Sequence, residues 1–243
     1  MLRILPHASV AEPVSTPTRT RQRGRFRILC VHRFSSDLTG PFAGPTLGRE
    51  TTGWREMTEA SAQRKVSLSS GEIVGPGVQC ISRTIGNMKG IYRDEQSRAS
   101  LVPETLVYRV QTFCPVEEGN EGGLFWGTTF VNPGMVGDEY FMTKGHHHAK
   151  RSRSEFYLTV AGAGALILMD ESRNTVFEPM SAGTLHYVSA YTAHRIANTG
   201  NAVLSVLACW PSDAGHDYDS IARDGFSARL RNINGSPVLV AEP

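Results

Sequence analysis

The sequence predicts an all-β protein, folded as a sandwich or a barrel of the double-Greek-key kind. Short apolar segments of strand length follow one another from Leu106 to the C-terminus, and turn residues separate them. The chain has 243 residues and is 40% hydrophobic, enough for one domain with a substantial core. No long amphipathic helical pattern interrupts the series. Many short strands without helices between them are typical of antiparallel sandwiches and barrels.

The N-terminal segment, residues 1–56, differs from the rest of the chain in charge. It holds nine Lys+Arg and four Asp+Glu, a net charge of +5, whereas residues 57–243 hold sixteen and nineteen, a net charge of −3. The basic run from Arg19 to Arg27 belongs to this extension, so the main domain has no charge pattern that favours nucleic acid.

Three interpretations of residues 1–56 compete: a disordered basic tail, a transit-like peptide, and an extension upstream of a true start at Met57. We favour the third, because the sequence after Met57 reads as an ordinary bacterial N-terminus. The sequence has no apolar run of secretory or membrane-spanning length, which predicts a cytoplasmic protein with no membrane partner.

The cysteines point to the same compartment. Cys30, Cys80, Cys114 and Cys209 show no CxxC spacing and no even-looking framework, which predicts reduced thiols in a cytosolic protein. Cys209 lies in an apolar run and is expected in the core.

The first elements are short. Residues 67–79 form glycine-punctuated short strands, and residues 95–100 form a helical turn at most. Residues 106–113 alternate in polarity, so Tyr108 is expected to share one face of a strand with Val110 and Thr112.

The later strands are predicted from apolar runs and the turn residues that bound them. Residues 124–131 end at Asn132-Pro133-Gly134, and residues 155–169 cross Gly162 and Gly164, which predicts a bend. An Asn234-Gly235 turn joins the last two strands into a hairpin. The remaining predicted strands are residues 139–143, 175–180, 184–188, 194–198, 203–210, 228–233 and 237–240.

A histidine cluster, His146-His147-His148, organises the chemistry. On a strand, His146 and His148 share one face, and the polar residues 149–154 form a turn that brings Glu155 onto the next strand of a hairpin. His194 is the candidate fourth ligand, since imidazole and carboxylate groups together suit first-row divalent metals. The alternative is that the histidines are a solvated polar run in a loop.

Three segments resemble a known family. Residues 143–157 (TKGHHHAKRSRSEFY) resemble the first cupin motif in the form found in cupin-type glucose-6-phosphate isomerases, and residues 183–200 (GTLHYVSAYTAHRIANTG) resemble the second motif. Residues 213–221 (DAGHDYDSI) resemble a signature of the isomerases rather than of cupins at large. The resemblance runs from about Val78 to the C-terminus and selects the cupin double-stranded β-helix barrel over the sandwich.

The resemblance implies reversible isomerisation of glucose 6-phosphate and fructose 6-phosphate, through a metal-stabilised enediolate, in glycolysis and gluconeogenesis. One divalent metal per subunit is expected, iron(II) first, with manganese, nickel and zinc compatible with the same ligands. Cupins commonly pair their barrels, so a homodimer is expected. Mannose 6-phosphate remains open as a second substrate, because it collapses to the same enediol.

The family pattern assigns roles to particular residues. Glu155 is expected to be both a metal ligand and the catalytic base, and Tyr157 follows it at spacing two. His216 and Tyr218 are expected to reach the open-chain sugar. The alternatives are purely structural roles: Tyr157 would only line the barrel, His216 would be a surface histidine, and Tyr218 would only pack.

The remaining assignments concern the ligands of the metal and of the phosphate. The metal ligands implied are His146, His148, Glu155 and His194. The phosphate-binding groups implied are Tyr108, Thr129, Thr143 and Gly145. Lys144 is a candidate cation for the same phosphate, but alternation places it on the opposite face from Thr143 and Gly145, where it would be a solvated or interface lysine. Arg195 is expected either near the phosphate or in an ion pair.

The sequence departs from the family pattern beside both motifs. Ser189, Ala190 and Thr192 stand where two prolines and a tryptophan are usual, and His147 stands where an aromatic residue is usual. No departure falls on a ligand. Two other functions stay open at this point: another metal-dependent cupin enzyme, such as a dioxygenase or an epimerase, and a non-catalytic sugar-phosphate-binding cupin.

Overall fold

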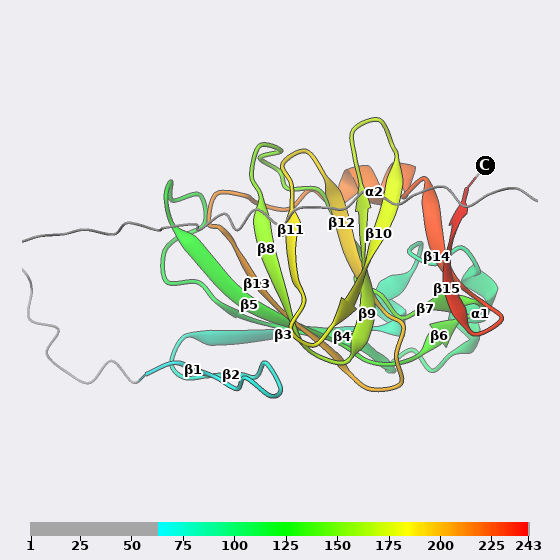
Figure 1. The fold of residues 1–243 in the computed structure, drawn as a ribbon, viewed down its shortest axis with the longest axis horizontal. Helices are drawn as coiled ribbons and strands as arrows, with labels where there is room; N and C mark the ends of the chain where they lie inside the picture. The colour runs from blue at the N-terminus through cyan, green and yellow to red at the C-terminus, as the bar shows by residue number, and fades with distance from the viewer. Residues whose placement is uncertain (1–62, 243) are drawn as a thin grey trace, which may run out of the picture. The chain divides into compact units, whose positions relative to one another are not determined.

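Strands dominate the part of the chain that the structure, a computed structural model, describes, which is residues 63–242 (Figure 1). The predicted extension, residues 1–56, lies outside the described residues. The strands are β1 Lys65–Val66, β2 Ile73–Val74, β3 Val78–Thr84, β4 Leu106–Phe113, β5 Leu124–Val131, β6 Met135–Val136, β7 Glu139–Tyr140, β8 Glu155–Ala161, β9 Ala163–Met169, β10 Thr175–Ser181, β11 Leu185–Val188, β12 Ala193–Asn198, β13 Leu204–Pro211, β14 Ala228–Ile233 and β15 Ser236–Ala241. The helical segments are η1 Ile85–Met88, α1 Glu95–Ser100 and α2 Asp219–Asp224. The all-β prediction is confirmed.

The largest sheet has six antiparallel strands in the order β11-β8-β13-β5-β4-β3. The alternation of inward and outward side chains predicted for single strands extends across this sheet, because residues paired between neighbouring strands point to the same face. Val110 pairs with Thr129, and Tyr157 pairs with Ala208. Those pairs therefore share one face of the sheet, which is the inner one.

The bend predicted at Gly162 passes the chain from this sheet to a second one. Gly162 has a φ of +81°, and a Cβ built there would lie 2.5 Å from the Val203 carbonyl oxygen, so only glycine fits the corner. Beyond it, β9 pairs with β10 and β12 in a three-stranded antiparallel sheet. The apolar inner faces of the two sheets meet in one core, with Val131 and Val206 from the first and Leu166 and Ile196 from the second.

A third sheet and the short helices lie at one end of the domain. Its order is β15-β14-β7-β6, and the Asn234-Gly235 hairpin joins β14 to β15 as predicted. The strand predicted over residues 139–143 is wrong in extent, because only Glu139–Tyr140 is a strand. Helix α2 was not predicted; it is a short segment with one buried residue, Ile221, which leaves no periodic signal.

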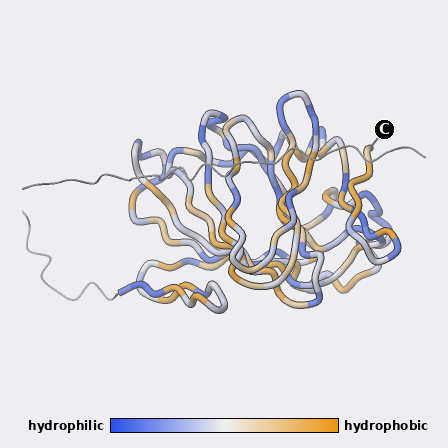
Figure 2. Tube along the Cα trace, in the orientation of Figure 1, coloured by the Kyte–Doolittle hydropathy of each residue, from blue (hydrophilic) through white to orange (hydrophobic). Residues whose placement is uncertain are grey.

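Hydropathy follows this arrangement. Figure 2 shows hydrophobic residues along the strands and hydrophilic residues in the loops at the top of the view. No helix within residues 63–242 has the length and apolar character needed to cross a membrane.

Candidate active site

A cavity of about 170 Å³ lies between the two sheets and collects the predicted site residues. The phosphate-binding candidates Tyr108, Thr129, Thr143 and Gly145 line it, as do the catalytic candidates Glu155, Tyr157, His216 and Tyr218. His146 and His194 also line the cavity. Residues that are up to 110 positions apart in the sequence therefore face one space.

The four predicted metal ligands converge at one wall of this cavity. The ligand atoms of His146, His148, Glu155 and His194 all lie within 4.8 Å of one another. Glu155 Oε1 is 2.6 Å from His194 Nε2 and 3.6 Å from His148 Nε2. Despite this proximity, the buried Glu155 Oε1 and His194 Nε2 lack the geometry of a hydrogen bond. Buried polar atoms that lie close together without hydrogen bonds to one another can be satisfied by one cation that they all bind. Three imidazoles and a carboxylate suit a first-row divalent metal.

Backbone carbonyls orient two of these imidazoles. His148 Nδ1 lies 2.9 Å from the Arg153 carbonyl oxygen, and His194 Nδ1 lies 3.3 Å from that of Thr192. A ring that donates its Nδ1–H to a carbonyl presents the Nε2 lone pair to a metal. Arg153 is itself fixed by Asp213, whose Oδ1 accepts from Arg153 Nε at 2.8 Å.

The predicted hairpin between the histidines and Glu155 is wrong. His146 forms an isolated bridge with His194 of β12, and His147 forms one with Asp217. The strand that carries Glu155, β8, pairs instead with β11 and β13. The ligands thus come from three separate segments, and the bridge to Asp217 holds the chain around His216 against the histidine cluster.

The protonation states of His146 and Glu155 suit metal binding. Burial, together with the neighbouring histidines, holds the pKa of His146 well below its usual range, so the ring is neutral at pH 7. For Glu155, burial alone raises the pKa, but the adjacent His194 and His148 side chains outweigh it and lower the pKa below its usual range. Neutral imidazole and ionised carboxylate are the forms that ligate metals.

Three further groups on the cavity wall can handle protons. Burial and the adjacent Glu155 carboxylate raise the pKa of Tyr157 well above its usual range, so its hydroxyl stays protonated. Burial lowers the pKa of His216, which keeps the imidazole neutral. The His216 ring stacks on Tyr218, with centroids 5.7 Å apart and an interplanar angle of 6°, and lies 4.5 Å from the His146 ring.

The cavity also offers neutral hydroxyl donors. Burial raises the pKa of Tyr108 to about 12. Thr143 Oγ1 accepts from the Ile196 N–H at 3.2 Å, which leaves the hydroxyl proton free to donate. Lys144 belongs to the cavity lining together with Thr143 and Gly145. Strand alternation does not apply here, since Gly145 has a φ of +77° and the segment is not a regular strand.

Sequence reasoning missed several lining residues, although some carried a signal. Val110 and Thr112 were expected on the same face as Tyr108 and do line the cavity. Gly127, Ala208 and Trp210 gave no signal of their own, and only the register of β5 and β13 places them there. Ile81 and Ile196 complete the lining. Cys209, expected in the core, is half-buried on the outer face of the same sheet.

Comparison with known proteins gives one family. The family model described as glucose-6-phosphate isomerase matches residues 82–239. The glucose-6-phosphate isomerase of Pyrococcus abyssi is 41% identical over 181 residues, covering 74% of this chain and 94% of that protein. That of Thermococcus kodakarensis is 40% identical over 179 residues, covering 73% and 93%. The putative glucose-6-phosphate isomerase 2 of Rhizobium meliloti is 33% identical over 175 residues, covering 71% and 86%. A crystal structure of Lactobacillus farciminis oxalate decarboxylase overlaps 46% of the chain, and 30% of its own, at 15% identity with a TM-score of 0.36.

Proposed function

The chain belongs to the glucose-6-phosphate isomerase family and interconverts glucose 6-phosphate and fructose 6-phosphate, and we propose that it does so at the histidine-lined cavity with a bound divalent metal. The convergence of three imidazoles and Glu155 on one buried point is the observation that carries this site. The family membership sets aside the oxygenase, epimerase and non-catalytic alternatives. We place the reaction in cytoplasmic glycolysis and gluconeogenesis, and assign it to residues 57–243.

The metal ligands in this proposal are His146, His148, Glu155 and His194. A bound divalent ion supplies Lewis-acid polarisation of the substrate oxygens on C1 and C2. We propose iron(II) as the native ion, since a mixed imidazole and carboxylate set accommodates it; manganese, nickel and zinc fit the same ligands.

The chain's own residues supply the proton chemistry. Isomerisation moves one proton between C2 and C1 and another between O1 and O2. Glu155 is ionised, so its carboxylate takes the C2 proton and returns it to C1. The protonated Tyr157 hydroxyl, beside Glu155, donates a hydrogen bond to the oxygen that becomes negative. Neutral His216, stacked on Tyr218, exchanges the hydroxyl proton during ring opening.

The phosphate is bound by hydroxyl and amide donors of the cavity lining. Tyr108, Thr129 and Thr143 present hydroxyl donors, and Gly145 presents its backbone N–H. No glycine-rich helix N-terminus faces the cavity within residues 63–242, so hydroxyl groups and single amides do this work instead. Lys144 adds a cation at the same wall.

The test is a coupled assay of fructose 6-phosphate conversion on chelator-stripped protein, before and after iron(II) or manganese is added. We expect metal-dependent turnover in the unmodified chain and loss of at least about 100-fold in Glu155→Gln, the range of general base catalysis. Glu178→Gln is the matched control, because Glu178 is half-exposed, contacts His186 and lies outside the cavity. Full activity in metal-free protein, or in Glu155→Gln, contradicts the proposal.

We also propose a homodimer formed through the outer face of the six-stranded sheet. Its apolar side chains, called here the outer apolar face, are Leu124, Trp126, Phe156, Leu158, Leu185 and Tyr187. Phe156 and Tyr187 are each 51% exposed and pair across β8 and β11. Cys209 of β13 continues the row to Trp126 of β5. Exposed apolar residues contiguous over four strands are typical of an interface, and one face can pair with its own copy about a two-fold axis.

Another part of that outer face is covered by the chain itself. The turn between β1 and β2 packs there, with Thr128 Oγ1 donating to the Gly71 carbonyl at 2.7 Å and Ser205 Oγ donating to that of Ser70 at 2.6 Å. Within residues 63–242 nothing comparable bonds over Phe156 and Tyr187. A second copy is therefore the occupant we propose for the outer apolar face.

A further inference from the structure

Arg195 carries a buried positive charge for which the described residues provide no carboxylate. It is 7% exposed, and its Nε has no hydrogen-bond partner. The guanidinium contacts uncharged groups: Nη1 lies 3.2 Å from the Met142 sulfur, and the guanidinium carbon lies 4.0 Å from the centroid of the Phe226 ring. Arginine stays charged at neutral pH, and an unpaired buried charge is costly, so a partner is missing.

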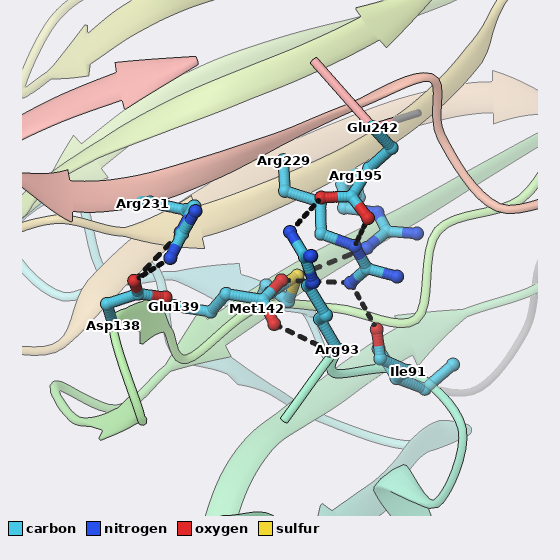
Figure 3. A network of polar contacts seen from close by, with 9 residues as sticks. All are labelled: Ile91, Arg93, Asp138, Glu139, Met142, Arg195, Arg229, Arg231 and Glu242. Carbon is cyan, nitrogen blue, oxygen red and sulfur yellow. Dashed lines mark hydrogen bonds and ion pairs between the residues drawn. The ribbon is translucent and has the colours of Figure 1, made fainter. Parts of the chain in front are cut away.

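The nearest buried carboxylate is already paired. Glu139, 1% exposed, accepts from Arg229 Nη1 at 2.9 Å and from the Arg93 backbone N–H at 2.7 Å. Figure 3 shows this network around Arg195 and Met142. Arg231 is likewise paired with Asp138. The network therefore balances its own charges and leaves that of Arg195 in excess.

Arg195 lies directly behind the wall of the cavity. It does not line the cavity, but a Cβ built on Gly145, which does, would lie 2.8 Å from Arg195 Nε and 3.1 Å from Arg195 Cβ. Gly145 thus contacts the Arg195 side chain and also belongs to the cavity lining. The same wall carries the Thr143 hydroxyl and Lys144.

We propose that Arg195 is a positioning residue for the phosphate dianion of the substrate, acting through the Gly145 backbone without touching the phosphate. This inference rests on the proposed function of the cavity and adds the source of its charge complementarity. The excess charge that destabilises the empty protein is balanced when a dianion enters the cavity. A second cation, held behind the wall that carries Lys144 and the hydroxyl donors, favours a phosphate dianion over uncharged sugars without having to contact it.

The first test uses Arg195→Met with inorganic phosphate as the probe. We expect the variant to fold with a Tm equal to or above that of the unmodified chain, because an uncompensated charge is removed. The KM for fructose 6-phosphate and the inhibition constant of phosphate should each rise roughly 10-fold, the order expected when one charge that attracts a dianion is removed from a partly screened site. The metal content should be unchanged, and Arg195→Lys should restore most of the affinity.

A second variant keeps the arginine and cancels its charge. Met142→Glu places a carboxylate where the Met142 sulfur now contacts Arg195, and it should weaken phosphate inhibition as Arg195→Met does, whereas Met142→Gln should not. This comparison decides the question even if Arg195→Met fails to fold. Arg231→Met is the control, because Arg231 is already paired with Asp138. It should leave phosphate inhibition unchanged.

The outcomes separate this inference from the proposed function. Absence of metal-dependent turnover in the unmodified chain removes the proposed function, and with it the basis of the inference. Normal turnover, with unchanged phosphate inhibition in Arg195→Met or Met142→Glu, overturns the inference alone. A lower Tm in Arg195→Met with unchanged KM identifies Arg195 as a purely structural residue.

Discussion

Gly127→Ala tests whether the packing of the six-stranded sheet sets the form of the substrate cavity. Gly127 lies in β5, and a Cβ built there would lie 2.9 Å from the Gln111 carbonyl oxygen and 2.9 Å from Cη2 of Trp210. Gly127 and Trp210 both line the cavity. The backbone of β4 cannot retreat without breaking its ladder, so the Trp210 ring must move. The substitution should therefore change both the stability of the fold and the shape of the cavity.

The magnitude follows from overpacking. Inserting one methyl group into a filled space costs about 1–3 kcal/mol, and replacing glycine in a strand returns about 0.4–1 kcal/mol of unfolded-state entropy. Taking the middle of both ranges, the net loss of stability is about 1.3 kcal/mol, which lowers Tm by roughly 3–5 °C for a domain of this size. Displacement of Trp210 into the cavity should lower kcat/KM by roughly 10- to 100-fold.

Thermal denaturation and the coupled isomerase assay measure the two effects, with Gly86→Ala as the control. Gly86 has no positive φ, and a Cβ there meets its nearest atom, the Pro103 carbonyl oxygen, at 3.4 Å. We expect Gly86→Ala to leave activity unchanged and to move Tm by less than about 2 °C. A Gly127→Ala protein with the Tm and kcat/KM of the unmodified chain would refute the packing of Trp210 against β5.

Three further predictions concern the metal, acid stability and assembly. Asp213→Asn should weaken metal affinity about 10- to 100-fold, measured by chelator competition, because Asp213 fixes Arg153, whose carbonyl orients His148. Arg153 and Lys150 lower the pKa of Asp213 in the folded protein. The ionised Asp213 therefore stabilises the fold fully above its unfolded pKa of about 4, and this stabilisation is lost as the pH falls below that value. Asp213→Asn should flatten the decline of Tm below about pH 4. Phe156→Lys should convert the proposed dimer to monomers in sedimentation, since it places a charge in the outer apolar face.

Each of these has a control and a contrary outcome. Asp224→Asn removes an exposed carboxylate paired with Arg223 and should change neither metal affinity nor the acid response. Unchanged metal affinity in Asp213→Asn would show that the Arg153 carbonyl does not depend on it. Val176→Lys, at a 48% exposed position on β10, is the control for assembly, and a Phe156→Lys protein that remains dimeric would place the interface elsewhere.

The strands could be predicted because their signal is local. In residues 106–113 and 124–131, the alternation of side chains is written into neighbouring positions, and the predicted bounds match β4 and β5. The corner at Gly162 was also predictable, since a glycine inside an apolar strand indicates a bend or a close approach. Helix α2 was missed because a segment that buries one residue has no detectable period.

The candidate site was predictable as a set of residues but not as a geometry. All of its members except His148 line one cavity, yet the hairpin expected to join His148 to Glu155 is replaced by bridges to His194 and Asp217. The alternation used to place Lys144 does not apply to this segment either. A positive φ at Gly145 and pairing with distant strands override the local alternation, and neither can be read from adjacent residues.

The sequence by itself determined the all-β class, the strand positions and, through three motifs, the family and the candidate ligand residues. These depend on side-chain identity and short-range period. Only the tertiary structure decided that Gly127 and Trp210 line the cavity, that the candidate ligands converge from three segments, and that Arg195 contacts Gly145 with no paired carboxylate among residues 63–242. Each of those facts arises from contacts between residues far apart in the chain, whose energies depend on burial and distance rather than on sequence neighbours.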